Sequence, residues 1–529
     1  ELNTLANRVQ HWKNSIHMII ESSDKSTDYN KMSMLRPFIG YGPETFIVTY
    51  QSYYPKKLDT FMTNSGMLLD RPHNHYIYIV ASMGLLGLLG FLSIVIVFFY
   101  LAYILLKRIN TSNERFLIVG LVASMAGYLI DSIFNPSTLL TELIFWLALG
   151  LIIGIERFSF ASLNDRLVTP DDEISKLKTW PGQRYRMIRY YGAACAAIAL
   201  IVIGGIITVR PFLADIHLQR GLGFRASNIQ NSLNEFDKAL DLQPREAAYW
   251  GYLGEYSYFI ARNFGDTTIK KGFLTLSTDS YEQARDLEPY LAYRYYTLAD
   301  IYLYEAKEGN SERWPVVFTD YDKALRLFPD NAVILNKSVL ASYINDDIDD
   351  AWDKLDVSAA LDPNWSETVY LSSLLLISED EGAVAMRKID DEINSLQGAR
   401  YYQKLNYFSQ FCQRLANYGV LTQLHRTAAT YVEEMPDKWT PHAIYAFTSF
   451  YSGEPLTSVD EFDYAMSIVP DDEAGNLFRA IYQLTEIAPG YGVMIADIAA
   501  GWRDKLERTA DSEYVLVRLD SLLLNHVSE

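Results

Sequence analysis

The stretch DRPHNHYIYIVASMGLLGLLGFLSIVIVFFYLAYILL (Asp70–Leu106) joins a polar, partly cationic hexapeptide to a continuous apolar run. About 20 apolar residues in a helix cross the hydrocarbon core of a bilayer, so the run from Tyr76 to Leu106 predicts a membrane helix. The hexapeptide Asp70–His75 then lies at a membrane surface. Imidazole and guanidinium groups placed there can reach both a phosphate on a lipid and a partner in water.

Further apolar runs follow this one. With the first, they are residues 76–106, 116–133, 139–155 and 190–209. Each is long enough to cross a bilayer, so we expect four membrane helices. Gly84, Gly87 and Gly90 in the first helix offer positions for close packing against its neighbours.

Charge in the connections predicts the orientation, because Lys and Arg are retained on the cytoplasmic side. The cations are Lys107, Arg108 and Arg115 beside the first connection, and Arg157, Arg166, Lys176, Lys178, Arg184, Arg186 and Arg189 in the third. Residues 1–72 and everything after Arg210 are therefore expected on the outer side. The His73 cluster and the C-terminal half then share one side of the membrane.

The two parts of the 529-residue chain differ in charge. Residues 1–212 hold 19 Lys and Arg against 15 Asp and Glu, whereas residues 213–529 hold 27 against 50. The acidic part reads as a soluble domain and argues against nucleic acid as a partner, since phosphate binding needs a basic surface. The only cysteines, Cys195 and Cys412, lie far apart and indicate neither a disulfide framework nor a metal site.

A degenerate repeat begins after Arg210, in which a helix ends in Ala-x4-Pro. The pairs are Ala239/Pro244, Ala284/Pro289, Ala324/Pro329 and Ala465/Pro470, with Ser358/Pro363 as a variant. Trp250, Leu253 and Gly254 fit the first-helix signature of a tetratricopeptide repeat, as do Tyr295, Leu298, Ala299 and Tyr302. The part after Arg210 therefore resembles tetratricopeptide repeats.

Such helical hairpins bury their apolar faces only on one another, so they stack into a solenoid with a concave face. We read the tyrosines Tyr293, Tyr295, Tyr296, Tyr302 and Tyr304 as packing residues, with peptide or sugar binding as the alternative. The predicted fold class is all-α, a membrane domain followed by a soluble α-solenoid. The expected domains are an outer loop (residues 1–75), the membrane helices (76–210) and the repeats (211–529).

Four motifs precede or enter the first membrane helix in a fixed order. They are Arg8-x-x-x-Trp12, RPFIGYGPETF (Arg36–Phe46), Tyr53-Tyr54-Pro55 and Asp70–Asn74, followed by the Gly84/Gly87 pair. In this order the chain resembles the O-antigen ligase and polymerase family of membrane glycosyltransferases. More narrowly, it is similar to bacterial members that carry C-terminal tetratricopeptide repeats. The resemblance covers residues 5–155, and the repeats match as a separate module.

The resemblance implies a location in the bacterial inner membrane, with the repeats outside the cytoplasm. In the family, arginines of a large outer loop hold the diphosphate of an undecaprenyl-linked glycan, and a histidine in a His-Asn motif acts on the acceptor. Carried over by position, His73 is the catalytic residue. The diphosphate ligands are Arg8, Arg36 and Arg71, and the supporting residues are Asn74, Glu44 and Asp70.

The residues suit this chemistry. Guanidinium groups stabilise a diphosphate leaving group through permanently charged, bidentate contacts, and an imidazole can take the proton of an acceptor hydroxyl. Neither a metal nor a cofactor is then required, and a single displacement inverts the anomeric configuration. The expected partners are the lipid-linked glycan, membrane lipid, and an acceptor or protein on the repeats.

Other readings stay open. Asn74 could simply cap the following helix, and Arg8 and Arg36 could be surface charges. Ser82 replaces an acidic residue common in the family, and relatives carry more helices upstream, so we expect an N-terminally incomplete fragment or a remnant. The alternatives to a ligase are a non-catalytic, membrane-anchored scaffold of an envelope assembly and a polymerase.

Overall fold

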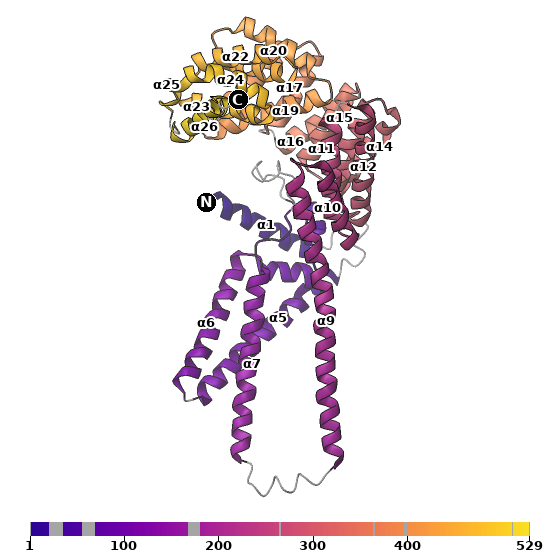
Figure 1. The fold of residues 1–529 in the computed structure, drawn as a ribbon, viewed down its shortest axis with the longest axis vertical. Helices are drawn as coiled ribbons and strands as arrows, with labels where there is room; N and C mark the ends of the chain where they lie inside the picture. Colours follow the sequence, from indigo (N-terminus) through magenta and orange to yellow (C-terminus); the bar gives the residue numbers. More distant parts are fainter. Residues whose placement is uncertain are drawn as a thin grey trace. The chain divides into compact units, whose positions relative to one another are not determined.

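The computed structural model describes residues 2–20, 35–54, 69–109, 111–167, 180–263, 266–362, 365–395, 399–509 and 512–527. Within these ranges every regular element is a helix, which confirms the predicted all-α fold class (Figure 1). The chain divides into two compact units, the first ending at Arg294 and the second beginning at Tyr295. Each unit is described by itself.

The first unit contains the N-terminal helices, the long apolar helices and the first helical hairpins. Its elements are α1 (Leu2–Ile20), α2 (Arg36–Ile39), α3 (Phe46–Tyr50), the 3-10 turn η2 (Gln51–Tyr53), α5 (His75–Arg108), α6 (Ser112–Phe134), α7 (Leu139–Leu167), α9 (Trp180–Phe224), α10 (Ile229–Leu242), α11 (Ala247–Asn263) and α12 (Thr267–Leu287).

The second unit consists of helical hairpins, and α13 (Ala292–Lys307) crosses into it from the first. The elements that follow are η3 (Ser311–Arg313), α14 (Trp314–Leu327), α15 (Ala332–Ile344), α16 (Ile348–Leu361), α17 (Ser366–Ser378), α18 (Gly382–Asn394), α19 (Ala399–Asn417), α20 (Thr422–Glu434), α21 (Trp439–Tyr451), α22 (Pro455–Ile468), α23 (Asp471–Ile487), α24 (Pro489–Ala499), η4 (Ala500–Trp502), α25 (Arg503–Leu506) and α26 (Ser512–Val527).

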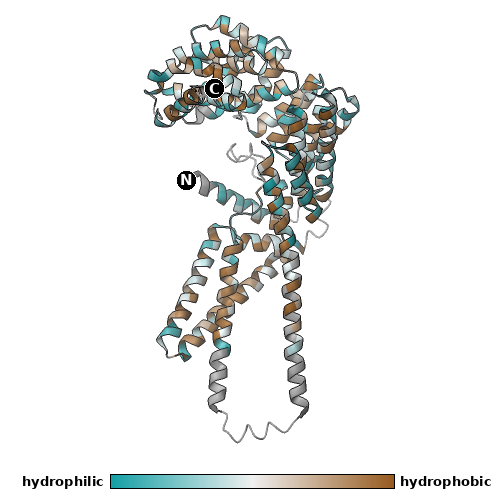
Figure 2. Cartoon of the chain, viewed as in Figure 1, coloured by the Kyte–Doolittle hydropathy of each residue, from teal (hydrophilic) through white to brown (hydrophobic). Residues whose placement is uncertain are grey.

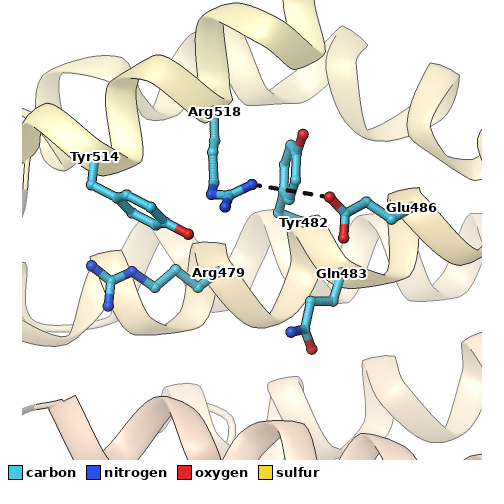
Figure 3. Close-up of a pocket in the computed structure, with 6 residues that line it drawn as sticks. All are labelled: Arg479, Tyr482, Gln483, Glu486, Tyr514 and Arg518. Atoms are coloured by element: carbon cyan, nitrogen blue, oxygen red, sulfur yellow. Dashed lines mark ion pairs between the residues drawn. The ribbon is translucent and has the colours of Figure 1, made fainter. Parts of the chain in front are cut away.

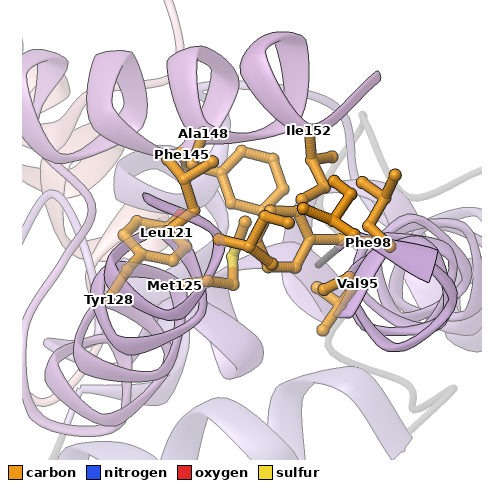
Figure 4. Packing of buried hydrophobic residues seen from close by; sticks show 12 residues of the cluster. Val95, Phe98, Leu121, Met125, Tyr128, Phe145, Ala148 and Ile152 are labelled. Carbon is orange, nitrogen blue, oxygen red and sulfur yellow. The ribbon is translucent and has the colours of Figure 1, made fainter. Parts of the chain in front are cut away.

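Helices α5, α6 and α7 pack together around an apolar core. Val95 and Phe98 of α5, Met125 of α6, and Phe145 and Ile152 of α7 meet there (Figure 4). The outward faces are apolar as well, and Leu139, for example, is 89% exposed (Figure 2). A helix that is apolar on all sides suits a hydrocarbon environment rather than water.

Three helices among the described residues are long and apolar enough to cross a membrane, and they contain three of the four predicted spans. They are His75–Arg108, Ser112–Phe134 and Leu139–Arg157. The fourth predicted span, residues 190–209, lies inside α9, where part of its side chains falls outside the described residues. Residues 168–179 of the cationic connection also lie outside them. The predicted domain boundary at residue 210 falls within α9, which continues to Phe224.

Helix α5 has a sharp kink at Gly84, a feature that the apolar pattern did not predict. Gly84 has a φ of 68°, in the left-handed region. The carbonyl groups of Ala81 and Ser82, in the turn before the kink, accept hydrogen bonds from the backbone N–H groups of Tyr41 (2.8 Å) and Gly42 (2.9 Å). The segment after α2 therefore satisfies backbone groups at the kink.

Two glycines allow this close approach of backbones. A Cβ atom on Gly84 would lie 2.1 Å from the carbonyl carbon of Phe38, and one on Gly40 would lie 2.3 Å from the carbonyl carbon of Ser82. Gly40 also has a left-handed φ, of 71°. The loop and the kinked helix thus interlock through positions that only glycine can occupy without strain.

The Ala-x4-Pro pattern correctly predicted the ends of helices in the repeats. Helices α10, α12, α14 and α22 end two residues before Pro244, Pro289, Pro329 and Pro470. The small residue of each pair, Ala239, Ala284, Ala324 and Ala465, is completely buried, as is Ser358 at the end of α16. Pro363, its partner in the pattern, lies outside the described residues.

The hairpins pack as a TPR-like solenoid. Helices pair as α11 with α12, α15 with α16, α17 with α18 and α21 with α22. Successive first helices also touch, from α15 through α17 and α19 to α21, and so form one row, while α18 and α20 touch in the other. We call the row α15–α17–α19–α21 the inner row. Of the five tyrosines predicted to be packing residues, Tyr302 and Tyr304 are buried, and the other three, Tyr293, Tyr295 and Tyr296, are half-buried.

The interlock predicts unequal effects of two glycine substitutions in α5. Gly84→Ala places a Cβ into the backbone of Phe38 at a left-handed φ, and we expect a loss of about 3 kcal/mol or more of stability. Gly90→Ala is the matched control, because no atom lies within 4 Å of its Cβ position. Thermal unfolding of the detergent-solubilised chain, followed by size-exclusion chromatography, measures both. Equal melting temperatures would contradict the interlock.

Candidate functional site

The sequence motifs before α5 fold against its first turns. Met18, Phe46, Tyr50, Leu69 and Ala81 form a small buried cluster there. The Phe46 and Tyr50 rings stack with centroids 4.8 Å apart, one helical turn from each other in α3. This cluster fixes α1, α3 and the start of α5 relative to one another and so supports the polar residues beside it.

Arg71 is the centre of the hydrogen bonds in the polar cluster. Its guanidinium donates to the Oε1 of Glu44 at 3.3 Å and to the carbonyl oxygen of Ser137 at 2.9 Å. The same carboxylate oxygen accepts from the Tyr78 hydroxyl at 3.0 Å, and the guanidinium stacks on the Tyr78 ring. Because Glu44 is 72% exposed, its ion pair with Arg71 contributes little and can exchange for another anion.

Two residues of this cluster adopt left-handed backbone conformations. His73 has a φ of 52° and Glu44 a φ of 58°. Glutamate rarely adopts this conformation, and strained residues of this kind gather at functional sites, where surrounding contacts hold them. His73 thus lies in the non-helical segment just before α5, whose first residue is His75.

The first helix holds this turn from the other side. The indole nitrogen of Trp12 donates to the carbonyl oxygen of Pro72 at 2.9 Å, and the Arg8 guanidinium donates to the carbonyl oxygen of Phe134 at 3.0 Å. Burial, and then the positive charge of Arg8, lower the pKa of His73, while Asp70 opposes the shift. His73 is therefore held as a neutral imidazole at neutral pH.

Asn74 caps helix α5. Its side-chain oxygen accepts from the backbone N–H of Ile77 at 2.9 Å, and its amide donates to the carbonyl oxygen of Ile133 at 2.9 Å. These bonds fit the alternative reading of Asn74 as a helix cap, and they tie the start of α5 to the end of α6. Arg36 lies in another part of the loop, where it donates to the carbonyl oxygen of Gly40 and stacks on Tyr41.

The structure thus brings Arg8, Glu44, Asp70, Arg71 and His73 into one polar cluster. Sequence reasoning missed Tyr78 as a member, although it lies one helical turn after Asn74. Trp12 was part of a quoted motif but had no expected contact with Pro72. No group of His, Cys, Asp or Glu side chains able to hold a metal ion occurs in the described part of the chain.

A buried pair beneath the cluster was also missed. His11 is 3% exposed, and a hydrogen bond of 2.8 Å joins its Nδ1 to the Tyr50 hydroxyl. Burial, with a smaller effect of His73, lowers the pKa of His11 from 6.5 to about 4. Desolvation also raises the pKa of Tyr50, so both partners are neutral at physiological pH. Nothing in the spacing of His11 and Tyr50 predicts this contact.

Gln51 connects the loop to the first hairpins. It is 2% exposed, and its amide group donates to the carbonyl oxygen of Tyr290 at 3.0 Å and accepts from the backbone N–H of Ala292 at 2.9 Å. Both partners lie in the first unit, in the turn between α12 and α13. The loop that carries the polar cluster is therefore bonded to the turn from which α13 begins.

The inner row of the second unit contains a cavity of about 200 Å³. It is lined by α15, α17 and α19 through Lys337, Trp365, Glu367, Tyr407, Gln410 and Arg414, among others. Lys337 pairs with Asp300, and Arg414 pairs with Glu367. The cations of this cavity are thus matched by carboxylates, and its wall combines aromatic and polar groups.

The lowered pKa of His11 predicts a loss of stability in acid. The unfolded chain protonates His11 near pH 6.5 but the folded chain only near pH 4, so this contribution is intact above pH 6.5. It falls by up to about 3 kcal/mol as the pH drops towards 4. We expect His11→Gln to reduce the fall in melting temperature between about pH 7.5 and about pH 5. Exposed His17→Gln is the control, and an unchanged fall in His11→Gln would contradict the assignment.

No family model matches the sequence, and no curated protein matches it. Similar solved structures include Pseudomonas aeruginosa pilF, with 16% identity over 47% of this chain and 100% of that chain and a TM-score of 0.29. Yeast Tom70 has 15% identity over 57% of this chain and 58% of that chain, with a TM-score of 0.31. A tetratricopeptide repeat protein from Parabacteroides merdae has 17% identity over 52% of this chain and 100% of that chain, with a TM-score of 0.22. At such low scores the helical-repeat assignment rests on the chain's own hairpins.

Proposed function

We propose that this chain is a membrane-anchored helical-repeat protein whose repeats bind a protein partner. The observation that carries the proposal is the inner row, where first helices of successive hairpins leave a cavity lined by aromatic and polar side chains. A solenoid of this kind offers an extended surface on rigid elements, which suits recognition of a polypeptide. The apolar helices α5, α6 and α7 would hold the repeats at a membrane surface.

The proposal predicts that a partner contacts the inner row and not the outer helices. A photo-crosslinking residue at Gln410 of α19 should form one specific adduct in cells, identified by mass spectrometry. The same residue at Arg426, exposed on α20 in the other row, is the matched control and should not form that adduct. Adduct formation at Arg426 alone, or at neither position, would contradict the proposal.

We propose a second function for the polar cluster, transfer of a glycan from undecaprenyl diphosphate to an acceptor hydroxyl. Its support is the proximity of Arg8, Arg71 and a neutral His73 at the head of three apolar helices. Arg8 and Arg71 would hold the diphosphate, with Arg71 exchanging its exposed partner Glu44 for phosphate. The neutral imidazole of His73 would accept the acceptor's proton as its oxygen attacks the anomeric carbon.

This mechanism places the cluster and the repeats on the outer side of a bacterial inner membrane, as the charge pattern also suggests. A single displacement would invert the anomeric carbon. A ligase and a polymerase share these steps and differ only in the acceptor. The acceptor of a ligase is a different kind of molecule, whereas the acceptor of a polymerase is a second lipid-linked glycan. Arg36 lies in the segment that packs on Gly84, and its hydrogen bond to the carbonyl oxygen of Gly40 would stabilise the conformation of that segment rather than bind the diphosphate.

If the chain transfers a glycan as proposed, replacing His73 should lower the rate of transfer, and replacing another histidine should not. In membranes containing the full chain and an undecaprenyl-diphosphate glycan, we expect His73→Ala to lower transfer by about a hundredfold or more. His17→Ala is the matched control, because His17 is an exposed histidine of α1 outside the cluster. Transfer at the wild-type rate by His73→Ala would remove His73 from the mechanism. Absence of transfer by the wild type with several donors and acceptors would leave the scaffold as the function.

A further inference from the structure

The kink at Gly84 divides α5 into two parts that do not share an axis. The ring centroids of His75 and Phe91 lie 5.7 Å apart, and those of Tyr76 and Phe91 lie 6.1 Å apart. Phe91 follows His75 by 16 positions, which would separate the two residues by about 24 Å along a straight helix. The part before Gly84 therefore bends back towards the part that follows it.

The part of α5 after the kink has the length of one membrane crossing. Residues 85–106 number 22, and as a helix they rise about 33 Å, compared with about 30 Å for the hydrocarbon core of a bilayer. Lys107 and Arg108 follow directly and end the helix. Gly84 thus lies at the opposite end of the span from these two cations, where the chain reaches a membrane surface.

Exposed apolar side chains surround the kink. The main chain of α2 lies against Gly84, because a Cβ there would be 2.4 Å from the backbone nitrogen of Ile39. All four residues of α2 are at least partly exposed, and the Phe38 side chain is 52% exposed. We call the exposed apolar residues on the two sides of this contact the kink patch. They are Leu35, Phe38, Ile39, Met83, Leu85 and Leu86.

The kink patch continues into the outward face of α5. Leu89, Leu92 and Ile96 are exposed on the same helix, which is long and apolar enough to cross a membrane. Contiguous exposed apolar surface of this kind marks a contact with a partner or a membrane. Lipid acyl chains that cover the outward face of α5 would also reach the kink patch, so one environment accounts for both.

The main chain beside the kink patch is suited to an apolar environment. The backbone N–H of Gly40 donates to the carbonyl oxygen of Arg36 at 2.8 Å, and those of Tyr41 and Gly42 donate to carbonyl groups of α5. The Arg36 guanidinium also turns back, to the carbonyl oxygen of Gly40 at 3.1 Å. A non-helical segment tolerates contact with hydrocarbon only where the protein satisfies its main-chain groups, and this segment meets that condition.

The repeats show a contrasting situation in a cavity of about 330 Å³ between α23 and α26 (Figure 3). The Arg518 Cζ lies 4.5 Å from the centroid of the Tyr514 ring, and its Nη1 lies 4.0 Å from the Oε1 of Glu486. Arg479 stacks on the same tyrosine ring. The charged groups of that cavity already contact partners within the protein, whereas the side chains of the kink patch remain exposed.

We propose that residues 35–39 form an interfacial membrane anchor, in which the kink patch inserts among lipid acyl chains just below the phosphate groups. Apolar faces that bind a membrane in this way lie about 5–10 Å deep, at the boundary of headgroups and acyl chains. Arg36, which stacks on Tyr41, stays at the level of the phosphates. The inference rests on the proposed anchoring of the chain by α5, α6 and α7, and it adds a lipid contact made by the loop.

The anchor also sets the level of the polar cluster relative to the membrane. The backbone N–H of Gly42 donates to the carbonyl oxygen of Ser82 at the kink, and Glu44 follows two residues later. Glu44 in turn accepts hydrogen bonds from Arg71 and Tyr78. The segment that inserts into the membrane is therefore only a few residues from the cluster, which it holds at the headgroups.

Spin labelling of the full chain in nanodiscs of phosphatidylethanolamine and phosphatidylglycerol tests the inference. A nitroxide is attached to Phe38→Cys in a Cys195→Ala background, because Cys412 is buried and does not react. Its accessibility to oxygen and to a water-soluble nickel complex, calibrated with spin-labelled lipids, should give a depth of about 5–10 Å below the phosphates. A nitroxide in water at this position would overturn the proposal.

Two matched labels separate the possible outcomes. Leu147→Cys, at an exposed apolar position of α7, should lie deeper than the label at Phe38, and Arg426→Cys, on exposed α20, should lie in water. Hydrocarbon around Leu147 but water around Phe38 would overturn the interfacial anchor and leave the anchoring of the chain by its apolar helices intact. Water around both positions would overturn both.

The unlabelled chain allows an independent measurement. A phosphatidylglycerol that carries a diazirine near the start of one acyl chain should modify residues 35–39 on illumination, as identified by mass spectrometry. Leu456, an apolar residue of the repeats that is 70% exposed, is the matched control and should stay unmodified. Modification of Leu456 to the same extent, or none within residues 35–39, would contradict the anchor.

Discussion

The kink of α5 at Gly84 is the constraint on which the arrangement of the N-terminal part depends. A helix broken in its interior leaves carbonyl groups without their usual donors, and in an apolar environment each unsatisfied group costs several kcal/mol. The backbone of Tyr41 and Gly42 supplies these donors, which fixes the loop against the helix. Glu44 follows two residues later and hydrogen-bonds Arg71 and Tyr78. The position of Glu44 in the polar cluster therefore depends on the backbone hydrogen bonds that Tyr41 and Gly42 make at the kink.

The polar cluster combines permanently charged arginines with a histidine that is kept neutral. Arg8 and Arg71 supply fixed positive charge, and burial near them keeps His73 neutral. The proposed glycan transfer would use the first property to bind a diphosphate and the second to accept a proton. Both properties come from residues that lie beside the end of α6 and the start of α7. The carbonyl groups of Phe134, at the end of α6, and of Ser137, in the connection after it, accept hydrogen bonds from the two guanidinium groups, so the backbone here orients both arginines.

The sequence predicted those features that depend on local pattern. The length of the apolar runs predicted the three helices that are long and apolar enough to cross a membrane. A small residue five positions before a proline predicted where repeat helices end. Helices α18 and α20 escaped this pattern, because α18 ends without a proline and Tyr431 of α20 stands where the alanine is expected before Pro436. Contacts such as Tyr50 with His11, or Trp12 with Pro72, join segments far apart in the chain, and no spacing rule contains them. Gly84, Gly87 and Gly90 were predicted to pack against neighbouring helices, and this prediction was wrong. A Cβ on Gly87 would meet only residues of α5 itself, one on Gly90 would meet nothing within 4 Å, and Gly84 marks the break in the helix, where the loop around Phe38 approaches it.

The contact of Gln51 with Ala292 also has a consequence for biosynthesis. The two residues are separated by 241 positions. At typical rates of translation of about 5–20 residues per second, the partner of Gln51 emerges roughly 10–50 seconds after the loop itself. During that interval the buried amide of Gln51 lacks its final bonds, and the loop over the polar cluster cannot reach its finished form. The loop that carries the cluster therefore gains these two bonds only in chains whose first repeat hairpins have been made and folded.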